Sequence, residues 1–454
     1  MESIADYIRN HQSQYIEELK EFLRIPSISA SKAHREDCRR AAQFLMTRFQ
    51  SMGFENSLHE TAGNPVVLAK YMAGEGKPTL LIYGHYDVQP VDPIDLWLTP
   101  PFEPTITYEK IFARGASDDK GQIYTHVKAA EAHLKIRGSL PVNLIFLIEG
   151  EEEIASNHLE KFIRENKEAL RADAAVISDG SQFAPDMPAI CYGLRGICVE
   201  EIRVEGPGWD LHSGSFGGAT PNPLNEMCAI VAKLKDAKGK ILIPGFYDDV
   251  APLELWEKKA FAELPWDDES FCCELKLPGL FGEDGYSTIE RKWARPTLDV
   301  NGIFGGYEGE GSKTIIPAWG GAKITMRLVP HQDPKKINAL FREYVQEIAP
   351  PHIRVLFAPH SGCGPVAFPR SAPFMAEAES AIRNAFGKPP VFIREGGSIP
   401  IVLTLKEELG LHTLLLGWGQ PDDGAHSPNE RFHLKDFERG MIASAWLMEL
   451  CGKK

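Results

Sequence analysis

The sequence predicts an α/β protein, in which a mostly parallel mixed sheet flanked by helices carries an inserted α+β domain. Two observations predict this fold class. In residues 1–194 and 368–454, short apolar runs alternate with segments of helical periodicity, as expected for a sheet covered on both faces. Residues 195–367 instead show strands in which apolar and polar residues alternate, which is typical of half-exposed strands. A chain of 454 residues is long enough for two or three domains.

The first part, residues 1–194, opens with two helical patterns. Apolar residues recur at helical spacing from Ile4 to Leu23, and Pro26 ends this pattern. A second helix is expected over residues 36–52, with Gly53 just beyond its end. Strands and helices then alternate. The expected strands are 66–72, 79–83, 142–148 and 174–178, and the expected helices are 121–134 and 157–170.

The inserted part, residues 195–367, begins with a run at 197–206 that alternates like a half-exposed strand. Its other expected elements are strands at 297–306, 322–330 and 353–359 and helices at 223–238 and 334–348. The α/β alternation resumes in the third part, residues 368–454. Helices are expected there at 374–386 and 434–451, and strands at 391–393 and 411–417.

Composition excludes several classes of function. The net charge is −14 and no block of five or more Lys or Arg occurs, so we expect neither a nucleic-acid partner nor an anionic membrane surface. No apolar run approaches the ~18 residues that a membrane span needs. The eight cysteines are scattered without a CxxC pair, as buried free thiols usually are. The start of the chain lacks the features of a signal peptide, which predicts a cytoplasmic protein.

Carboxylates and histidines directly follow five of the apolar runs. They are His85 and Asp87, then Asp118 and Asp119, then Glu149, Glu151, Glu152 and Glu153, then Asp179, and finally Asp422, Asp423 and His426. In open α/β sheets ligands bind at the carboxyl ends of the strands, so we expect these side chains to meet at one rim. So many carboxylates repel one another unless cations lie among them. Ligand sets of His, Asp and Glu suit zinc, manganese or cobalt, and two such ions that share a carboxylate form a hydrolytic site.

Each motif taken alone has an ordinary explanation. His85 by itself is most often a structural histidine. The acidic run 149–153 could begin a solvated helix, and Asp118 with Asp119 could form a turn or a helix cap. The convergence of five strand ends is what favours metal binding.

Five motifs, in this order and spacing, resemble the co-catalytic di-metal peptidases. This family includes cytosolic non-specific dipeptidase, carnosinase, glutamate carboxypeptidase, aminoacylase and succinyl-diaminopimelate desuccinylase. The motifs are GHYDVQP, ARGASDDKGQ, EGEEEIAS, SDG and DDGAHSPNE. The segments DLHSGSFGG, ITMRLVP and REGGSIP also match the dipeptidase and carnosinase subgroup, which the sequence resembles most. The resemblance covers nearly the whole chain.

The resemblance implies the ligands of two divalent ions. His85 and Asp179 would hold one ion, and Glu153 and His426 would hold the other. Asp118 would bridge both ions, with a cis peptide bond to the following Asp119. Zinc is the first expectation for both positions, and manganese and cobalt are the alternatives.

The resemblance also implies the catalytic groups. Glu152 would be the general base, taking a proton from the attacking water and giving it to the leaving amine. Asp87 would orient His85 without touching a metal, because residues two apart lie on the same face of an extended segment. His212 would reach the active site of the partner subunit and stabilise the oxyanion. Considered alone, His212 could equally be an ordinary surface residue of a loop.

Substrate contacts are implied for a further group of residues. Arg327 would bind the terminal carboxylate of the substrate, although an arginine on a strand is most often a salt-bridge partner. Glu395 would meet the substrate amine. The remaining implied contacts are Thr314, His360, Gly397 and Ser398.

Within the family, the residue at position 179 favours one subgroup. Aspartate there goes with dipeptidases and aminopeptidases, whereas glutamate goes with glutamate carboxypeptidases and deacylases. The resemblance therefore implies hydrolysis of dipeptides by a homodimer, with residues 195–367 as its lid and dimerisation domain. Two alternatives stay open: an N-acyl-amino-acid deacylase or metallocarboxypeptidase with the same di-metal centre, and a catalytically silent protein that binds metal or peptide.

Overall fold

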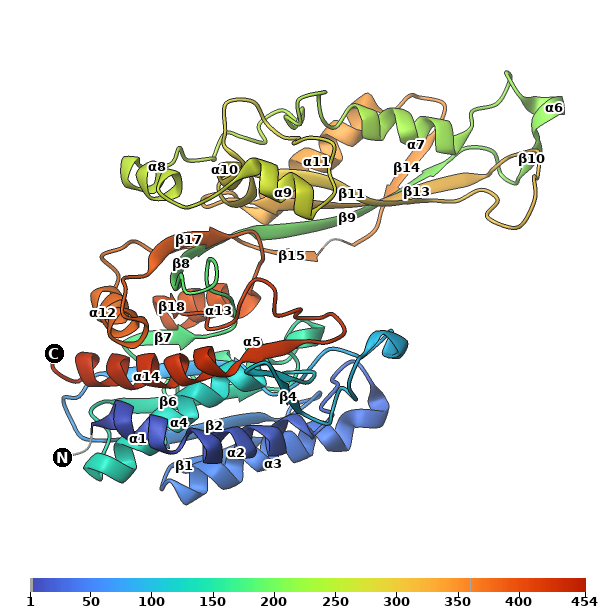
Figure 1. Cartoon of the computed structure of the whole chain (residues 1–454). Helices are drawn as coiled ribbons and strands as arrows, with labels where there is room; N and C mark the ends of the chain where they lie inside the picture. The colour runs from blue at the N-terminus through green and yellow to red at the C-terminus, as the bar shows by residue number, and fades with distance from the viewer. Residues whose placement is uncertain (1–2, 360) are drawn as a thin grey trace. The chain divides into compact units, whose positions relative to one another are not determined.

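The chain divides into two units in the computed structural model, which describes residues 3–359 and 361–454 (Figure 1). Unit 1 consists of Met1–Tyr192, Phe368–Ile393 and Pro400–Lys454, and unit 2 of Gly193–Ala367 and Arg394–Ile399. Unit 2 is thus inserted into the sequence of unit 1, and it includes a short second segment at 394–399. The role expected of residues 195–367, a lid and dimerisation domain, stays a prediction.

A mixed sheet forms the core of unit 1. Seven of its nine described strands lie in the order β1 (Glu55–His59), β2 (Val66–Tyr71), β6 (Asn143–Glu149), β3 (Thr79–His85), β7 (Ala174–Ile177), β18 (Thr413–Leu415) and β8 (Ala189–Leu194). The short strands β16 (Val366–Ala367) and β17 (Val391–Glu395) also pair with β8. The central strands β6, β3, β7 and β18 pair in parallel, and the pairs at the margins are antiparallel. This confirms the predicted α/β class with a mixed sheet.

The central strands are apolar along their whole length because helices cover the sheet. Every residue of β6 is buried, and in β3 all but the first residue are buried. The helices of unit 1 are α1 (Ile4–Asn10), α2 (Gln12–Leu23), α3 (Arg35–Ser51), α4 (Lys120–Arg137), α5 (Leu159–Glu165), α12 (Met375–Phe386), α13 (Pro400–Leu409) and α14 (Leu434–Cys451). Helix α4 packs against α14, which packs against α12, whereas α5 packs against α13 (Figure 1).

Two predicted helices of unit 1 differ from the structure. The helix expected over 4–23 is divided into α1 and α2, because His11 leaves helical geometry with φ −106° and ψ 6°. The helix expected over 157–170 is reduced to α5, whose end at Asn166 also leaves helical geometry. Neither difference moves a residue of the predicted site, since both helices lie outside the strand ends.

Unit 2 is built on an antiparallel sheet with one covered face. Its strands lie in the order β11 (Thr297–Phe304), β13 (Trp319–Leu328), β9 (Gly196–Glu205) and β14 (Arg354–Phe357), and β15 (Ser361–Cys363) also pairs with β9. Even-numbered residues of β9 are buried, and Cys198, Ile202 and Val204 among them join a core with α7 (Pro223–Ala232) and α11 (Pro334–Ile348). Its odd-numbered residues are partly or fully exposed, as the alternating sequence pattern predicts.

The stretch 239–296 contains α8 (Leu255–Ala262), α9 (Asp268–Glu274) and α10 (Thr288–Trp293). A two-stranded sheet of β10 (Leu211–His212) and β12 (Ile315–Ile316) lies beside the short helix α6 (Ser213–Phe216) in unit 2 (Figure 1). A three-stranded sheet of β19 (Arg431–His433), β5 (Lys110–Phe112) and β4 (Thr105–Thr107) belongs to unit 1.

The expectation of buried cysteines holds only in part. Among the residues that the structure describes, none forms a disulfide. The buried cysteines are Cys38, Cys191, Cys198 and Cys451, whereas Cys228 and Cys273 are exposed on helices of unit 2. Within the same described residues, no helix is both long enough and apolar enough to cross a bilayer.

Candidate metal centre

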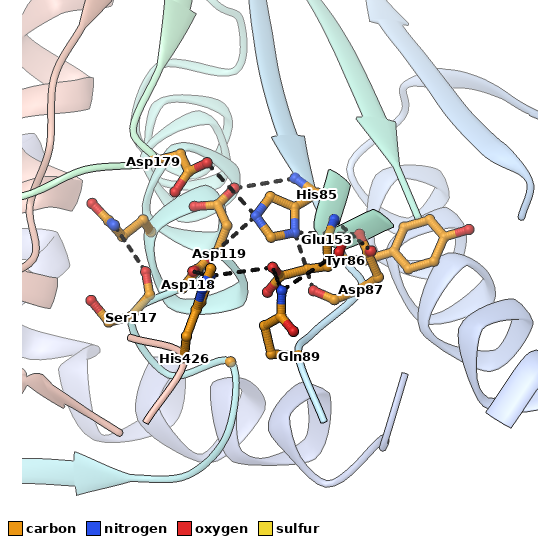
Figure 2. Close-up of polar contacts among 12 residues, drawn as sticks. His85, Tyr86, Asp87, Gln89, Ser117, Asp118, Asp119, Glu153, Asp179 and His426 are labelled. Carbon is orange, nitrogen blue, oxygen red and sulfur yellow. Dashed lines mark hydrogen bonds and ion pairs between the residues drawn. The ribbon is translucent and has the colours of Figure 1, made fainter. Parts of the chain in front are cut away.

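The predicted metal ligands of unit 1 meet at one rim of its sheet. His85 is the last residue of β3, and Asp179 follows the end of the adjacent parallel strand β7. Glu153 lies in a short 3-10 helix, Glu152–Ile154, just after β6. Asp118 lies in the turn before α4, and His426 lies in the loop between β18 and β19. Figure 2 shows their side chains pointing toward one another, as expected when parallel strands end at the same edge.

Asp118 lies between the two histidines. Its Oδ1 is 3.0 Å from Nε2 of His85, and its Oδ2 is 2.8 Å from Nε2 of His426 (Figure 2). Asp179 Oδ2 lies 3.8 Å from Nε2 of His85, and Glu153 Oε2 lies 3.2 Å from Nε2 of His426. The ligand atoms therefore form two groups of three, each within 4.8 Å, and Asp118 belongs to both. One carboxylate shared between two ligand groups is the arrangement of a two-metal site.

Asp87 supports the first group without belonging to it. Its Oδ1 lies 3.3 Å from Nδ1 of His85, and its backbone oxygen lies 3.1 Å from the same ring nitrogen. The other carboxylate oxygen accepts a hydrogen bond of 3.1 Å from the backbone N–H of Glu153. Asp87 and His85 are both fully buried. Asp87 therefore contacts one ligand from each group, and it directs a proton of His85 to Nδ1, which leaves Nε2 to face Asp118.

The peptide bond between Asp118 and Asp119 is cis, as the resemblance implied. Oδ2 of Asp119 accepts a hydrogen bond of 3.2 Å from the backbone N–H of His85 (Figure 2). Gln89 donates a hydrogen bond of 2.7 Å from its side-chain amide to Oε2 of Glu153. Sequence reasoning missed Gln89, although it stands inside the motif GHYDVQP.

The carboxylates at this rim shift the pKa values of the residues among them. Burial opposes the charged form of His85, but the carboxylates of Asp118 and Asp87 raise its pKa well above the ordinary value. Asp118 and Glu153 raise the pKa of His426 to about 10. Burial, together with the negative charges of Asp179 and Asp118, raises the pKa of Glu152 to about 8. The carboxylates of this rim therefore favour positive charge among them.

The donor set fits divalent cations. Nε2 of His85 is buried and makes no aligned hydrogen bond, although a carboxylate oxygen of Asp118 lies 3.0 Å away. A buried ring nitrogen that faces carboxylate oxygens without an aligned hydrogen bond is suited to a metal ion. Imidazole and carboxylate ligands without a thiolate match zinc, manganese or cobalt. Glu152 belongs to neither ligand group, so its carboxylate is available for proton transfer.

The predicted residues of unit 2 fall into two places. His212 ends β10, where its exposed ring accepts a hydrogen bond of 3.0 Å at Nδ1 from the N–H of Gly214. The carbonyl of the exposed Thr314 accepts a hydrogen bond of 3.0 Å from the N–H of Ser213, so Thr314 lies beside the His212 turn. His360 lies outside the described residues.

The second place in unit 2 gathers Arg327 and the segment 394–399. Arg327 lies on the partly exposed face of β13 and donates a hydrogen bond of 3.1 Å to Oγ of Ser398. Ser398 in turn donates to the backbone oxygen of Arg195. Glu395 ends β17 (Val391–Glu395), and burial raises its pKa to about 7, whereas Gly397 is exposed. Sequence reasoning missed Arg195, which carries no pattern beyond a single positive charge.

Known proteins are similar to this chain over nearly its whole length. Residues 81–449 match the model of Peptidase family M20/M25/M40. The chain belongs to this family. It is 33% identical to the Cys-Gly metallodipeptidase DUG1 of Candida albicans, over 100% of this chain and 98% of the relative. It is also 30% identical to the human Beta-Ala-His dipeptidase, over 99% of this chain and 92% of the relative.

Solved structures share the fold. The M20 family metallo-carboxypeptidase Sso-CP2 from Sulfolobus solfataricus matches with a TM-score of 0.86 and 34% identity, over 97% of this chain and 99% of that one. These matches confirm the family resemblance found in the motifs, and with it the class of metal-dependent peptide hydrolase.

Proposed function

We propose that this chain is a dipeptidase that hydrolyses dipeptides with a free terminal carboxylate at a centre of two divalent cations. The observation that supports it most is the position of Asp118 between His85 and His426, with one carboxylate oxygen toward each ring. His85, Asp118 and Asp179 would hold one cation, and Asp118, Glu153 and His426 the other. The two relatives named above are both dipeptidases by name, which favours the same substrate class for this chain.

When bound, the cations would supply Lewis-acid activation of a water and of the scissile carbonyl. The residues of the chain then have distinct tasks. Glu152 accepts the proton of the attacking water and delivers it to the nitrogen of the leaving amine. Asp87 keeps the proton of His85 on Nδ1, so that Nε2 stays available.

Unit 2 would supply the groups that recognise the substrate. Arg327 binds the terminal carboxylate with its planar guanidinium, and Ser398 holds that guanidinium in place. His212 stabilises the developing oxyanion in the partner subunit of a homodimer formed through residues 195–367. Glu395 meets the substrate amine, and Thr314, His360 and Gly397 complete the contacts. Zinc is the first choice of metal, with manganese or cobalt as alternatives, and the cytoplasm is the proposed location.

A substrate panel on metal-depleted protein tests the proposal. Zinc, manganese or cobalt is added back separately, and Cys-Gly, β-Ala-His, other dipeptides, tripeptides, C-terminally amidated dipeptides and N-acetylated amino acids are offered to each form. We expect dipeptides with a free carboxylate to be cleaved fastest, and amidation to reduce kcat/KM strongly because Arg327 then loses its partner.

The panel also separates the competing functions. Preferred turnover of N-acetylated amino acids would favour a deacylase, and preferred cleavage of longer peptides at the carboxyl end would favour a carboxypeptidase. Binding of dipeptides without cleavage of any peptide or amide in the panel would instead indicate a binding protein.

A further inference from the structure

The side chain of Glu430 forms a junction in unit 1 between two segments that are distant in the sequence, the one that ends at Glu430 and the turn at residues 114–118. Its carboxylate is fully buried and receives four hydrogen bonds from the turn at residues 114–118. Oε1 accepts from the backbone N–H groups of Ser117 and Asp118 at 2.9 and 3.0 Å. Oε2 accepts from the N–H of Gly115 at 3.0 Å and from the guanidinium of Arg114 at 2.8 Å. The bridging residue Asp118 is thus held at its backbone by a side chain from the far end of the sequence.

Two further side chains tie the same segments together. Ser117 donates a hydrogen bond of 3.0 Å to Oδ2 of the buried Asp423. Gln122 donates to the carbonyl of Ser117 at 2.8 Å, and its Oε1 accepts from the N–H of Trp418 at 2.7 Å. His426 lies in the sequence between Asp423 and Glu430. The loop that carries His426 is therefore anchored on both sides to the turn that carries Asp118.

The two ligand groups depend on this junction to different degrees. His85 and Asp179 stand at the ends of β3 and β7, whose parallel pairing fixes their spacing. His426 stands on a loop, with φ 62°, and 57% of its side chain is exposed. The spacing of His426 from Asp118 is consequently set by the anchors at 423 and 430, and not by the sheet.

We propose that Glu430 is a positioning residue that sets the affinity of the second cation position, formed by Asp118, Glu153 and His426. The inference rests on the two-cation centre proposed above. The four hydrogen bonds of the Glu430 carboxylate fix the loop that carries His426 at a set distance from the turn that carries Asp118. His85 and Asp179 keep their places through the pairing of β3 with β7, so the loss of this anchor affects the second position. Asp423, through Ser117, is the second anchor of the same junction.

A general contribution to stability is the competing explanation, because Glu430 also pairs with the buried Arg114. The two explanations differ in a measurable way. Loss of stability alone changes the melting temperature without favouring one cation position over the other. A positioning role changes the affinity of the second position selectively.

The test is a count of bound ions against free Mn²⁺ or Zn²⁺ by equilibrium dialysis, with the melting temperature measured on the same samples. We expect two binding steps in the wild-type protein, and His426→Ala identifies the step that belongs to the second position. In Glu430→Gln, an NH₂ group replaces one carboxylate oxygen, and this group cannot accept a hydrogen bond from the donors that face it. We expect the second step to weaken about 10–100-fold while the first step stays unchanged.

Two further variants keep the test decisive. Glu200→Gln in unit 2 alters another buried carboxylate paired with an arginine, Arg342 at 3.0 Å, and should leave both binding steps unchanged. Ser117→Ala removes only the hydrogen bond to Asp423. If Glu430→Gln does not fold, ion binding by Ser117→Ala tests the inference in its place. This substitution should weaken the second step in the same direction by a smaller factor.

The outcomes separate this inference from the proposed function. Equal weakening of both steps, or two unchanged steps in the variant that folds, overturns the role of Glu430. A wild-type protein that binds no pair of ions and cleaves no dipeptide overturns the proposed function instead.

Discussion

The two units hold their functional side chains in opposite ways. In unit 1, His85 and Asp87 are completely buried and contact each other and their neighbours on several sides. In unit 2, His212 is exposed and its ring bonds to its own turn, and Arg327 is only partly buried. The buried pair of unit 1 is therefore held in place by its neighbours, whereas His212 and Arg327 of unit 2 are accessible to solvent. We expect substitutions in unit 1 to affect metal binding and proton transfer, and those in unit 2 to affect contacts with the substrate or with the transition state.

The largest expected effect concerns Glu152, which precedes the candidate ligand Glu153 and belongs to neither ligand group. Glu152→Gln should lower kcat by about 10²–10⁴-fold, because an amide cannot accept the proton of the attacking water. Steady-state kinetics together with metal analysis checks this, since both ions should remain bound. Glu151→Gln is the matched control, because Glu151 instead contacts His158 at 2.7 Å. Near-normal turnover of Glu152→Gln would remove Glu152 from the role of general base.

The next effect is expected at His212 in unit 2. His212→Ala should lower kcat by about 10²–10³-fold, with a small change in KM, because the oxyanion forms only along the reaction. His352→Ala is the control, as His352 is another half-exposed histidine of unit 2. A change confined to KM would show that His212 binds the ground state of the substrate instead.

Arg327 should contribute mainly to substrate binding. Arg327→Ala should raise KM and lower kcat/KM by about 10²-fold, because a charge-assisted contact to the carboxylate is lost. Arg203→Ala is the matched control, since Arg203 lies on the same sheet face, on β9, over the ring of Trp319. Equal losses for dipeptides and their amidated forms would contradict the assignment of Arg327 to the carboxylate.

Mixing the last two variants tests the homodimer. If His212 acts in the partner subunit and Arg327 in its own, a mixed dimer of His212→Ala and Arg327→Ala subunits keeps one intact site. Random exchange of subunits makes half of the dimers mixed, so about a quarter of wild-type activity should return. Mixed dimers that form and remain inactive would contradict this division of His212 and Arg327 between the two subunits.

The sequence predicted best the positions of those residues that the strands of the sheet hold in place. The strands that end at His85 and Asp179 are adjacent and parallel, so the rule that ligands bind at strand ends placed these residues correctly relative to each other. The change from uniformly apolar strands to alternating strands also marked the sheet of unit 2. Both features can be read from a single sequence, because each depends on which faces of the strands are buried.

Contacts that depend on backbone donors could not be predicted. Three of the four groups that donate to Glu430 are backbone N–H groups of a distant turn, and no residue pattern encodes them. The segment 394–399, which packs in unit 2, is too short to disturb the periodicity of the α/β part around it. The division of the first helix at His11 likewise depends on local backbone geometry.

The smallest expected effect concerns Asp87, which supports the candidate ligand His85 in unit 1. Asp87→Asn should weaken ion binding about tenfold while leaving the melting temperature of the metal-loaded protein nearly unchanged. The amide can still accept from one of the two N–H groups, at His85 Nδ1 or at Glu153, but its NH₂ group then faces the other donor. Asp173→Asn is the control, because Asp173 accepts a hydrogen bond from Thr79 at the opposite end of β3. If Asp87→Asn binds ions as tightly as the wild-type protein, then the strand alone orients His85 and the buried carboxylate serves another purpose.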